Sequence, residues 1–352
     1  MSSMTPRARL LAALRWEEPD QVPLTCYAPL LPSGYAERRL RNAGLGLIVR
    51  LPVHTVEYRT VRFSSCEYWE NGERVVRKTI HTPIGRLSQT LRPDPAYGTS
   101  HWVSEHFIKG PADYRVMEYV QRDAIYHDNF DALRENQRRL GDDGIVMVRL
   151  MKIPLTEILY QMTGLERFAA DYRFQREPFD SLHNTMLERC EELYDLAAAA
   201  PVDVIQMSDN ITADVVGKER FRAYCVPVYA RLAQRLAGSG KLIAVHLDGR
   251  LRALMDAIAR ANFEVVEAFT PPPMGDFSLR EARQAWPDKA IWLNYTSSLH
   301  IEAPSVIAAH TRQLLDEAGS KRGIAISVTE DAPAAALERS LLIIQGVLAD
   351  YA

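Results

Sequence analysis

Three side chains of this sequence, His246, Glu267 and Glu330, combine the chemistry of metal ligands with that of acid–base catalysts. Each stands at the end of a short apolar run of the kind that forms a buried strand. A catalytic zinc ion takes nitrogen and oxygen from three protein ligands and keeps one position open. Without a metal, Glu330 could act as a base or hold a cationic group, and His246 could be a hydrogen-bonded core histidine. The three residues therefore predict a site for zinc or another divalent metal, or an acid–base site.

Other polar and aromatic residues stand at similar positions, directly after apolar runs. We predict that Asp209 is catalytic together with His246 and Glu330. We predict a substrate-binding role for four further residues: Tyr27, Lys152, Asn294 and Tyr295. The alternative for Asp209 is a turn or helix-capping role, and the alternative for the aromatic residues is ordinary packing.

The stretch 241–276 indicates how such residues are positioned. An apolar run at 242–245 is followed by a helical pattern over 251–258 and by a second apolar run at 265–266. Strand, helix and strand within about 30 residues form the βαβ unit of a parallel sheet. In a closed barrel of such units, the residues at the carboxyl ends of the strands surround one mouth, where the chemistry takes place.

The same alternation of strand and helix patterns extends over most of the chain. Apolar runs predict about seven parallel strands, at 22–27, 145–150, 202–207, 242–245, 265–266, 290–293 and 323–328. This pattern predicts one α/β domain over residues 1–352 with a (β/α)8, or TIM, barrel fold. A helix is expected over 36–47, and a loop with a short helix start over 101–114.

Residues 51–92 interrupt this alternation of strand and helix patterns. Two segments of alternating apolar and polar residues flank Asn71-Gly72. Asn-Gly between alternating segments is typical of a β-hairpin. We therefore predict an antiparallel β insertion over 51–92, in the N-terminal part of the barrel.

Composition argues against several classes of protein. A net charge of −3 offers no basic surface for nucleic acid, and no run of about 18 apolar residues predicts a membrane span. The N-terminal segment predicts an amphipathic helix with Leu10, Leu11 and Leu14 on one face, not a signal peptide. The four cysteines are scattered, which suits the cytoplasm and not a cysteine-built zinc site. The sequence also lacks GxGxxG, GxxxxGK[ST], HExxH and GxSxG motifs.

Several segments resemble the uroporphyrinogen decarboxylase superfamily. The opening MTPRARLLAALRWEEPDQVPL is similar to that family's first helix and its P-D-x-V-P entry to the first strand. The segment 246–294 resembles the central block of an uncharacterised branch related to corrinoid-dependent methyltransferases, and ISVTEDAP resembles its last-strand motif. The resemblance implies a distorted (β/α)8 barrel.

Two activities follow from the resemblance. The decarboxylases hold substrate carboxylates with an R-Q-A-G-R loop, whereas the matching stretch TCYAPLLPSGY has no arginine. The methyltransferases exchange a methyl group with a corrinoid on a partner protein, using zinc held by H-x-C and a later cysteine. The first motif is His246-Leu247-Asp248 in this chain, and the segment 327–330 lacks cysteine. Carboxylate ligands suit an oxygen or amine substrate better than a thiol.

We therefore predict methyl transfer from a small methoxy or methylamine-type substrate to a corrinoid protein. One alternative is a carboxy-lyase for uroporphyrinogen or a related carboxylate, in which Asp209 stabilises positive charge on a pyrrole-like ring and arginines such as Arg149 or Arg250 bind the substrate. Another alternative is a non-catalytic barrel that binds a small molecule. The late helices and the Trp286-Pro287 corner offer a surface for a homodimer.

Overall fold

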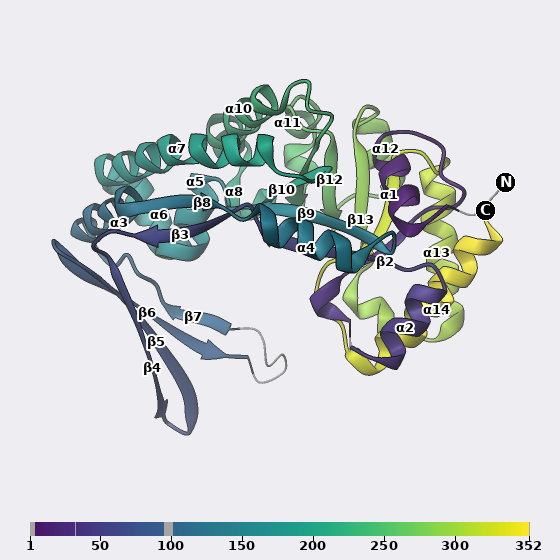
Figure 1. The fold of residues 1–352 in the computed structure, drawn as a ribbon, viewed down its shortest axis with the longest axis horizontal. Helices are drawn as coiled ribbons and strands as arrows, with labels where there is room; N and C mark the ends of the chain where they lie inside the picture. Colours follow the sequence, from purple (N-terminus) through teal and green to yellow (C-terminus); the bar gives the residue numbers. More distant parts are fainter. Residues whose placement is uncertain (1–3, 32, 95–100, 352) are drawn as a thin grey trace. The chain divides into compact units, whose positions relative to one another are not determined.

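Eight parallel strands close into a barrel in the computed structural model, which describes residues 4–31, 33–94 and 101–351 (Figure 1). Around the barrel the strands follow the order β1-β14-β13-β12-β11-β10-β9-β2. Their bounds are β1 Leu24–Tyr27, β2 Gly46–Pro52, β9 Gly144–Leu150, β10 Val204–Ile211, β11 Leu242–Leu247, β12 Val265–Phe269, β13 Ala290–Asn294 and β14 Ile324–Val328. The predicted (β/α)8 barrel is confirmed.

The eighth strand, β2, lies where the sequence suggested other elements. The helix expected over 36–47 ends early, since α2 spans Tyr35–Asn42. Gly44 has a φ of +98°, a conformation that ends a helix and that glycine adopts readily. The apolar run after it enters the barrel next to β9, where a Cβ on Gly144 would lie 1.9 Å from the Leu47 carbonyl oxygen. The antiparallel insertion therefore begins after Pro52, and not at residue 51.

The floor of the barrel, at the N-terminal ends of the strands, is closed by α1 (Pro6–Leu14). The Thr5 hydroxyl accepts a hydrogen bond from the Ala8 amide at 3.2 Å and so caps this helix. Backbone hydrogen bonds tie α1 to the residues just before β9 and β14. Its three leucines join the apolar side chains inside the barrel in one core cluster, which contains Leu10, Leu11, Leu14, Tyr27, Ile48, Ile145, Met147, Val204, Leu242, Ala244, Val265, Ala290, Trp292 and Ala325.

Helices that precede or follow the strands in the chain cover the outside of the barrel (Figure 1). They are α2, α4 (Phe130–Leu140), α8 (Ala213–Val216), α9 (Lys218–Arg220), α10 (Val226–Leu236), α11 (Met255–Ala259), α12 (Leu279–Ala285), α13 (Pro304–Ala318) and α14 (Ala334–Asp350). Short 3-10 turns lie at Ala28–Leu30, Arg252–Leu254 and Ser297–Ile301, and a π-helical turn lies at Phe221–Cys225. None of the helices in the described part of the chain has the length and apolar character that crossing a membrane requires.

The chain packs as two compact units. The first comprises Met1–Val53, Phe130–Leu150 and Ala197–Ala352 and contains the whole barrel. The second comprises His54–Asn129 and Met151–Leu196. A single domain over residues 1–352 stays a prediction.

The second unit contains two antiparallel sheets. One has the strand order β4-β5-β6-β7, with bounds Arg62–Glu70, Glu73–Thr82, Gly85–Pro93 and His101–Glu105. The other pairs β3 (His54–Tyr58) with β8 (Ala124–Asp128). The helices of this unit are α3 (Pro111–Asp123), α5 (Pro154–Glu157), α6 (Leu165–Phe174) and most of α7 (Arg176–Ala199), with a π-helical turn at Ile158–Thr163.

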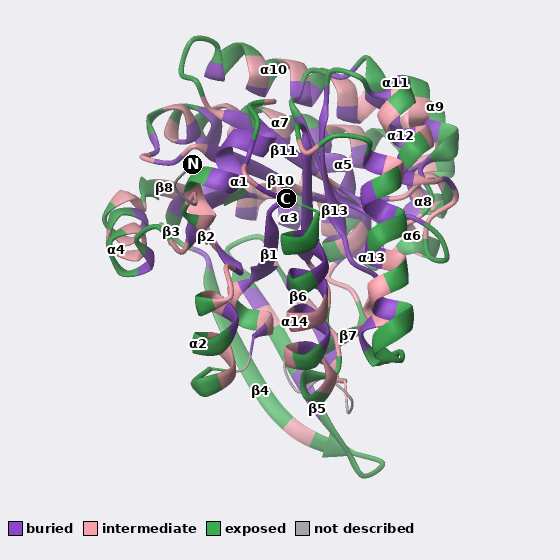
Figure 2. Cartoon of the chain, turned by 90° about the vertical axis from the view of Figure 1, so that its right-hand side faces the viewer, coloured by how far each residue is buried: buried purple, intermediate pink, exposed green. Residues whose placement is uncertain are grey.

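The antiparallel strands extend beyond the predicted 51–92. Asn71 and Gly72 form the turn between β4 and β5, with φ values of 53° and 82°. The segment expected as a loop at 101–114 begins with β7, because its alternating residues pair with β6. Figure 2 contrasts the buried strands of the barrel with the exposed strand β4.

Candidate active site

A layer of polar side chains lies above the apolar core, toward the carboxyl ends of the barrel strands. Successive residues of a strand alternate between its two faces, so residues two apart share a face. Five interior residues are each followed, two positions later, by a polar residue: Ile48 by Arg50, Met147 by Arg149, Val204 by Gln206, Ala244 by His246 and Val265 by Glu267. These five polar residues therefore face the interior of the barrel at its mouth.

Glu267, on β12, is the centre of this layer and is fully buried. One carboxylate oxygen, Oε1, accepts a short hydrogen bond from the Tyr27 hydroxyl. The other, Oε2, lies 2.6 Å from His246 Nδ1 and 2.9 Å from Gln206 Nε2, which also donates to the Tyr27 oxygen at 3.0 Å. Both oxygens are thus held by side chains from three other strands.

The backbone at Glu267 is irregular. The pairing between β12 and β13 shifts between Glu267 and Phe269, and Ala268 between them has a φ of 62°. A bulge of this kind re-aims side chains and is common at barrel rims and active sites. A non-glycine residue in the left-handed region is strained by about 1 kcal/mol or more. The fold therefore keeps a strained residue beside the buried carboxylate.

The network favours an ionised carboxylate. Burial alone would raise the pKa of Glu267, but the charge of His246 and hydrogen bonds from His246, Tyr27 and Gln206 hold it below its usual value. Burial and the negative charge of Glu267 raise the pKa of Tyr27 well above its usual value, so Tyr27 stays a hydroxyl donor. A carboxylate at this distance also stabilises a protonated imidazole. His246, whose side chain is 12% exposed, is the member of the network that reaches toward solvent.

Two arginines border the network. The guanidinium carbon of Arg50 lies 3.4 Å from the centroid of the Tyr27 ring, a cation–π contact. Partial burial and the neighbouring charge of Arg50 lower the pKa of Arg149. Neither guanidinium forms an ion pair with a carboxylate among the residues that the structure describes. Two adjacent like charges without a counter-charge favour the binding of an anion.

Glu330 belongs to a second cluster, at the ends of β13 and β14. Its Oε1 accepts hydrogen bonds from Asn294 Nδ2 at 3.0 Å and from the Ser297 amide at 2.9 Å. The Asn294 side-chain oxygen accepts from the Thr329 amide at 3.1 Å. The structure thus joins two predicted site residues, Asn294 and Glu330, in a network that braces the loops after these strands.

The other predicted residues lie elsewhere. Asp209 is buried and accepts a hydrogen bond at 2.8 Å from Tyr229 of α10, a helix outside the barrel wall. Tyr295 is also buried, and its hydroxyl donates to the Ile307 carbonyl of α13 at 3.2 Å. Lys152 belongs to the second unit, where its ammonium lies 5.9 Å from the centroid of the Tyr160 ring. The roles proposed for these three residues stay predictions.

The residues present do not fit a three-ligand zinc site. Both oxygens of Glu267 already accept hydrogen bonds, and Glu330 is held by Asn294 and Ser297. Within residues 4–31, 33–94 and 101–351, no group of three or more His, Cys, Asp or Glu side chains is arranged to hold a metal ion. The predicted metal stays a prediction.

The sequence profile of the uroporphyrinogen decarboxylase family matches residues 95–333, which is more than half of the chain. The chain belongs to the uroporphyrinogen decarboxylase family. No curated protein matches the sequence. Of the polar layer, Arg149, Gln206, His246 and Glu267 lie within the range that the family profile matches, whereas Arg50 precedes it. Tyr27, which bonds to Glu267, also precedes that range.

One solved structure supports the same fold. A methyltransferase from Methanosarcina mazei has a TM-score of 0.61 and 15% sequence identity, covering 99% of this chain and 100% of that one. At this identity the likeness shows the fold alone. A dipeptide epimerase from Methylococcus capsulatus complexed with Mg ion has a TM-score of 0.27 and 12% identity, covering 78% of this chain and 92% of that one. This second TM-score is too low to support a conclusion about the fold of this member of the decarboxylase family.

The sequence did not single out Arg50 or Gln206 in this family member. Arg50 was not predicted as a site residue because β2 was not recognised as a strand. Gln206 lies inside a predicted strand, one residue before its end, whereas the predicted site residues stand at or after the end of a strand. The signal that finds both is a polar residue on the interior face of a strand, two positions after an apolar one.

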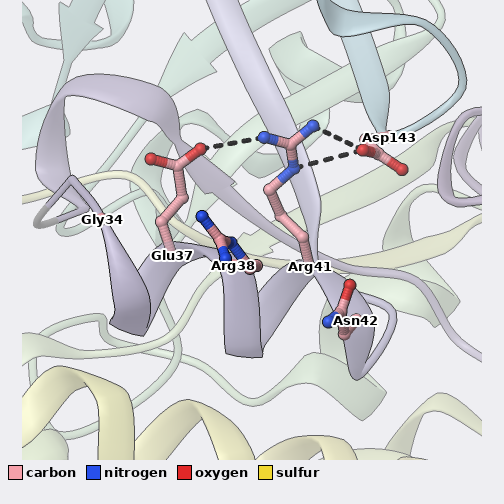
Figure 3. Close-up of a pocket in the computed structure, with 6 residues that line it drawn as sticks. All are labelled: Gly34, Glu37, Arg38, Arg41, Asn42 and Asp143. Carbon is pink, nitrogen blue, oxygen red and sulfur yellow. Dashed lines mark hydrogen bonds and ion pairs between the residues drawn. The ribbon is translucent and has the colours of Figure 1, made fainter.

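A surface cavity on α2 is separate from this site (Figure 3). Its volume is about 450 Å³, and its lining includes Glu37, Arg41 and Asp143. Arg41 is neutralised there by ion pairs with Glu37 and Asp143. The cavity contains no residue of the polar layer, so we assign it no catalytic role.

Proposed function

We propose that this protein is an enzyme that binds a small carboxylate-bearing substrate at the barrel mouth and donates a proton to it from His246. The observation that carries the proposal is the His246–Glu267 pair, joined at 2.6 Å, beside two arginines without carboxylate partners in the described residues. The arginines would hold the anionic group, and the buried Glu267 would keep His246 protonated.

The reaction that we favour is methyl transfer to an external acceptor, the reduced corrinoid of a partner protein. The bond between the methyl carbon and the substrate oxygen or nitrogen breaks, and its electron pair remains on that heteroatom. The methyl group passes to the acceptor, which acts as the nucleophile. The proton from His246 neutralises the heteroatom as it leaves, which is the work of a general acid. Tyr27 and Gln206 keep Glu267 in place through this step.

The fold of the Methanosarcina mazei methyltransferase, similar over nearly the whole chain, is consistent with this reaction. The missing thiolate ligands also fit it, because an oxygen or nitrogen leaving group needs a proton whereas an attacking thiol must lose one.

Decarboxylation is the second candidate, and the two arginines favour it. In this reaction the bond between the substrate and its carboxylate carbon breaks, carbon dioxide leaves, and the electron pair stays on the substrate. His246 would then protonate the carbon or heteroatom that carries the pair. A second carboxylate, bound at Arg50 and Arg149, would orient the substrate.

One experiment separates the two reactions. Purified protein is incubated with methoxybenzoates or N-methylated glycines, with and without free reduced corrinoid, while the corrinoid spectrum and carbon dioxide release are followed. Methyl transfer predicts a corrinoid-dependent spectral change that His246→Gln slows by about 100-fold or more. Carbon dioxide release without corrinoid would instead establish the second reaction.

The arginines are tested by binding. Titration calorimetry with benzoate should give a heat of binding that Arg50→Met and Arg149→Met each weaken by about tenfold or more. Arg250→Met is the matched control, since Arg250 is exposed and lies beside Asp214. Unchanged benzoate binding in both mouth variants would remove the anion site from the proposal.

A further inference from the structure

Strand β4 is an edge strand that is exposed over almost its whole length. It spans nine residues, Arg62–Glu70, and all but Tyr68 are exposed. Among the strands that the structure describes, it pairs with β5 alone. Two large aromatic side chains lie on it in solvent, Phe63 at 54% and Trp69 at 74% exposure. Soluble proteins normally shorten or cover such an edge, because its free backbone groups are ready to pair with another strand.

The hairpin turn determines which backbone groups are free. Glu70 and Glu73 flank the two-residue turn Asn71-Gly72, whose positive φ values are those of a type I′ turn. The residues that flank such a turn exchange hydrogen bonds, and the pattern then alternates along the strand. Four residues therefore direct their N–H and C=O groups away from β5: Phe63, Ser65, Glu67 and Trp69.

The side chains of β4 are complementary to the same strand running in the opposite direction. An antiparallel pair centred on Cys66 places Arg62 opposite Glu70 of the other strand. It also places Phe63 opposite Trp69, once at each side of the centre. Opposite charges and aromatic pairs are the cross-strand combinations that stabilise a sheet. Moving the centre by one residue would place Phe63 opposite Glu67 or Asn71 instead.

Backbone and side chains select the same register. With Cys66 at the centre, the four residues with free backbone groups lie opposite one another, which allows about eight hydrogen bonds between the strands. The Arg62 guanidinium donates hydrogen bonds to uncharged backbone carbonyls, including that of Val61 at 2.8 Å. It can exchange these bonds for an ionic contact with Glu70 of the other strand. Glu70 has one ion pair, with Arg92.

We propose that β4 binds β4 of a second copy of this chain, antiparallel, around a two-fold axis at Cys66. Such an isologous contact joins the two four-stranded sheets into one continuous sheet. It differs from the dimer surface expected from the sequence. Trp286 is only 1% exposed, and its indole N–H donates to the Met255 carbonyl at 3.0 Å, so this side chain packs in the core. A homodimer surface at the late helices and the Trp286-Pro287 corner stays a prediction.

Charge reversal provides the test, measured by sedimentation velocity of the full chain between about 1 and 100 μM. Arg62→Glu places like charges opposite Glu70 at both ends, and Glu70→Arg places like charges opposite Arg62. Each variant alone should weaken dimerisation by about tenfold. An equimolar mixture of the two variants should dimerise like the wild type, because every contact in the mixed dimer joins a glutamate to an arginine.

A second measurement locates the axis. A short bismaleimide should link wild-type chains through Cys66, and Cys66→Ser should abolish the link. A monomeric wild type across the concentration range would overturn the proposal. So would a dimer that both charge reversals leave unchanged, since another surface would then join the chains. Association of the mixture that is no tighter than that of either variant alone would also overturn it.

Discussion

The two ends of the barrel are built from the same strands and differ in almost every other respect. At the floor, the leucines of α1 belong to one apolar cluster with side chains such as Leu242 and Val204. At the mouth, the same two strands carry His246 and Gln206. Two residues on β10, and four on β11, thus separate a sealed apolar end from a hydrogen-bonded, ionised one. The difference indicates that the floor provides stability and the mouth provides chemistry, as in other barrels of this type.

Removing the charge of Glu267 while keeping its shape should impair turnover at the mouth much more than it lowers the stability of the fold. In Glu267→Gln, a neutral amide cannot stabilise a protonated His246, so turnover should fall by about 100-fold or more. Stability should fall by only about 1–3 kcal/mol, because an amide still accepts the Tyr27 hydrogen bond. Turnover of the methylated carboxylate and urea unfolding provide the two measurements. Full activity in this variant would show that the mouth does not act through His246.

The opposite result is expected at the floor. Leu14 is 1% exposed, and Leu14→Ala should lower the free energy of unfolding by about 2–4 kcal/mol. Turnover per folded molecule should stay within about twofold of the wild type. The exposed Glu17→Ala, three residues further on, should change the free energy of unfolding by less than about 0.5 kcal/mol. A large loss of turnover in Leu14→Ala at full folding would mean that floor and mouth are coupled.

Most of the barrel could be predicted from the sequence, because buried parallel strands are apolar runs separated by helices. The strand β2 could not, since its run LGLIVRLP directly follows a helix and precedes the alternating residues of β3. The periodicity of apolar residues alone does not show where the helix ends and where each strand begins in such a stretch. The boundary is fixed by Gly44 at positive φ and by the close approach of Gly144 to Leu47, which appear only in three dimensions.

The candidate site was predictable only in part, for a similar reason. His246 and Glu267 stand at neighbouring strand ends, and their contact follows from parallel pairing. Asp209 stands at a strand end too, but β10 is irregular there and its carboxylate accepts from Tyr229 of α10. Position along the chain predicts which end of the barrel a residue occupies. It does not predict on which side of the wall the side chain lies.

Lowering the pH should reduce the stability of the fold through a histidine that lies away from the mouth and its chemistry. His300 is fully buried outside the barrel, with Nδ1 2.7 Å from the Ser340 hydroxyl, and burial lowers its pKa to about 4. The unfolded chain therefore takes up a proton at a higher pH than the folded chain does, so stability is lost as the pH falls from about 6.5 to about 4.

The expected loss from this histidine is roughly 3 kcal/mol, at about 1.4 kcal/mol for each pH unit between 6.5 and about 4. Urea unfolding at several pH values should show that His300→Gln flattens this part of the profile. The pH profile of turnover, measured where the protein is folded, should be the same in His300→Gln as in the wild type. A shifted turnover profile would place His300 in the chemistry of the mouth.

The smallest expected effect concerns the backbone beside Glu267. Ala268 has a φ of 62°, so Ala268→Gly removes strain of about 1 kcal/mol while it increases the freedom of the unfolded chain by about as much. The free energy of unfolding should therefore change by less than about 0.5 kcal/mol. Ala244→Gly is the matched control, because Ala244 is equally buried on the neighbouring strand at ordinary φ, and it should lose about 1 kcal/mol. Equal losses in the two variants would mean that Ala268 is not strained. In that case the bulge at Glu267 would be an ordinary feature of a barrel rim, with no strain maintained for the site.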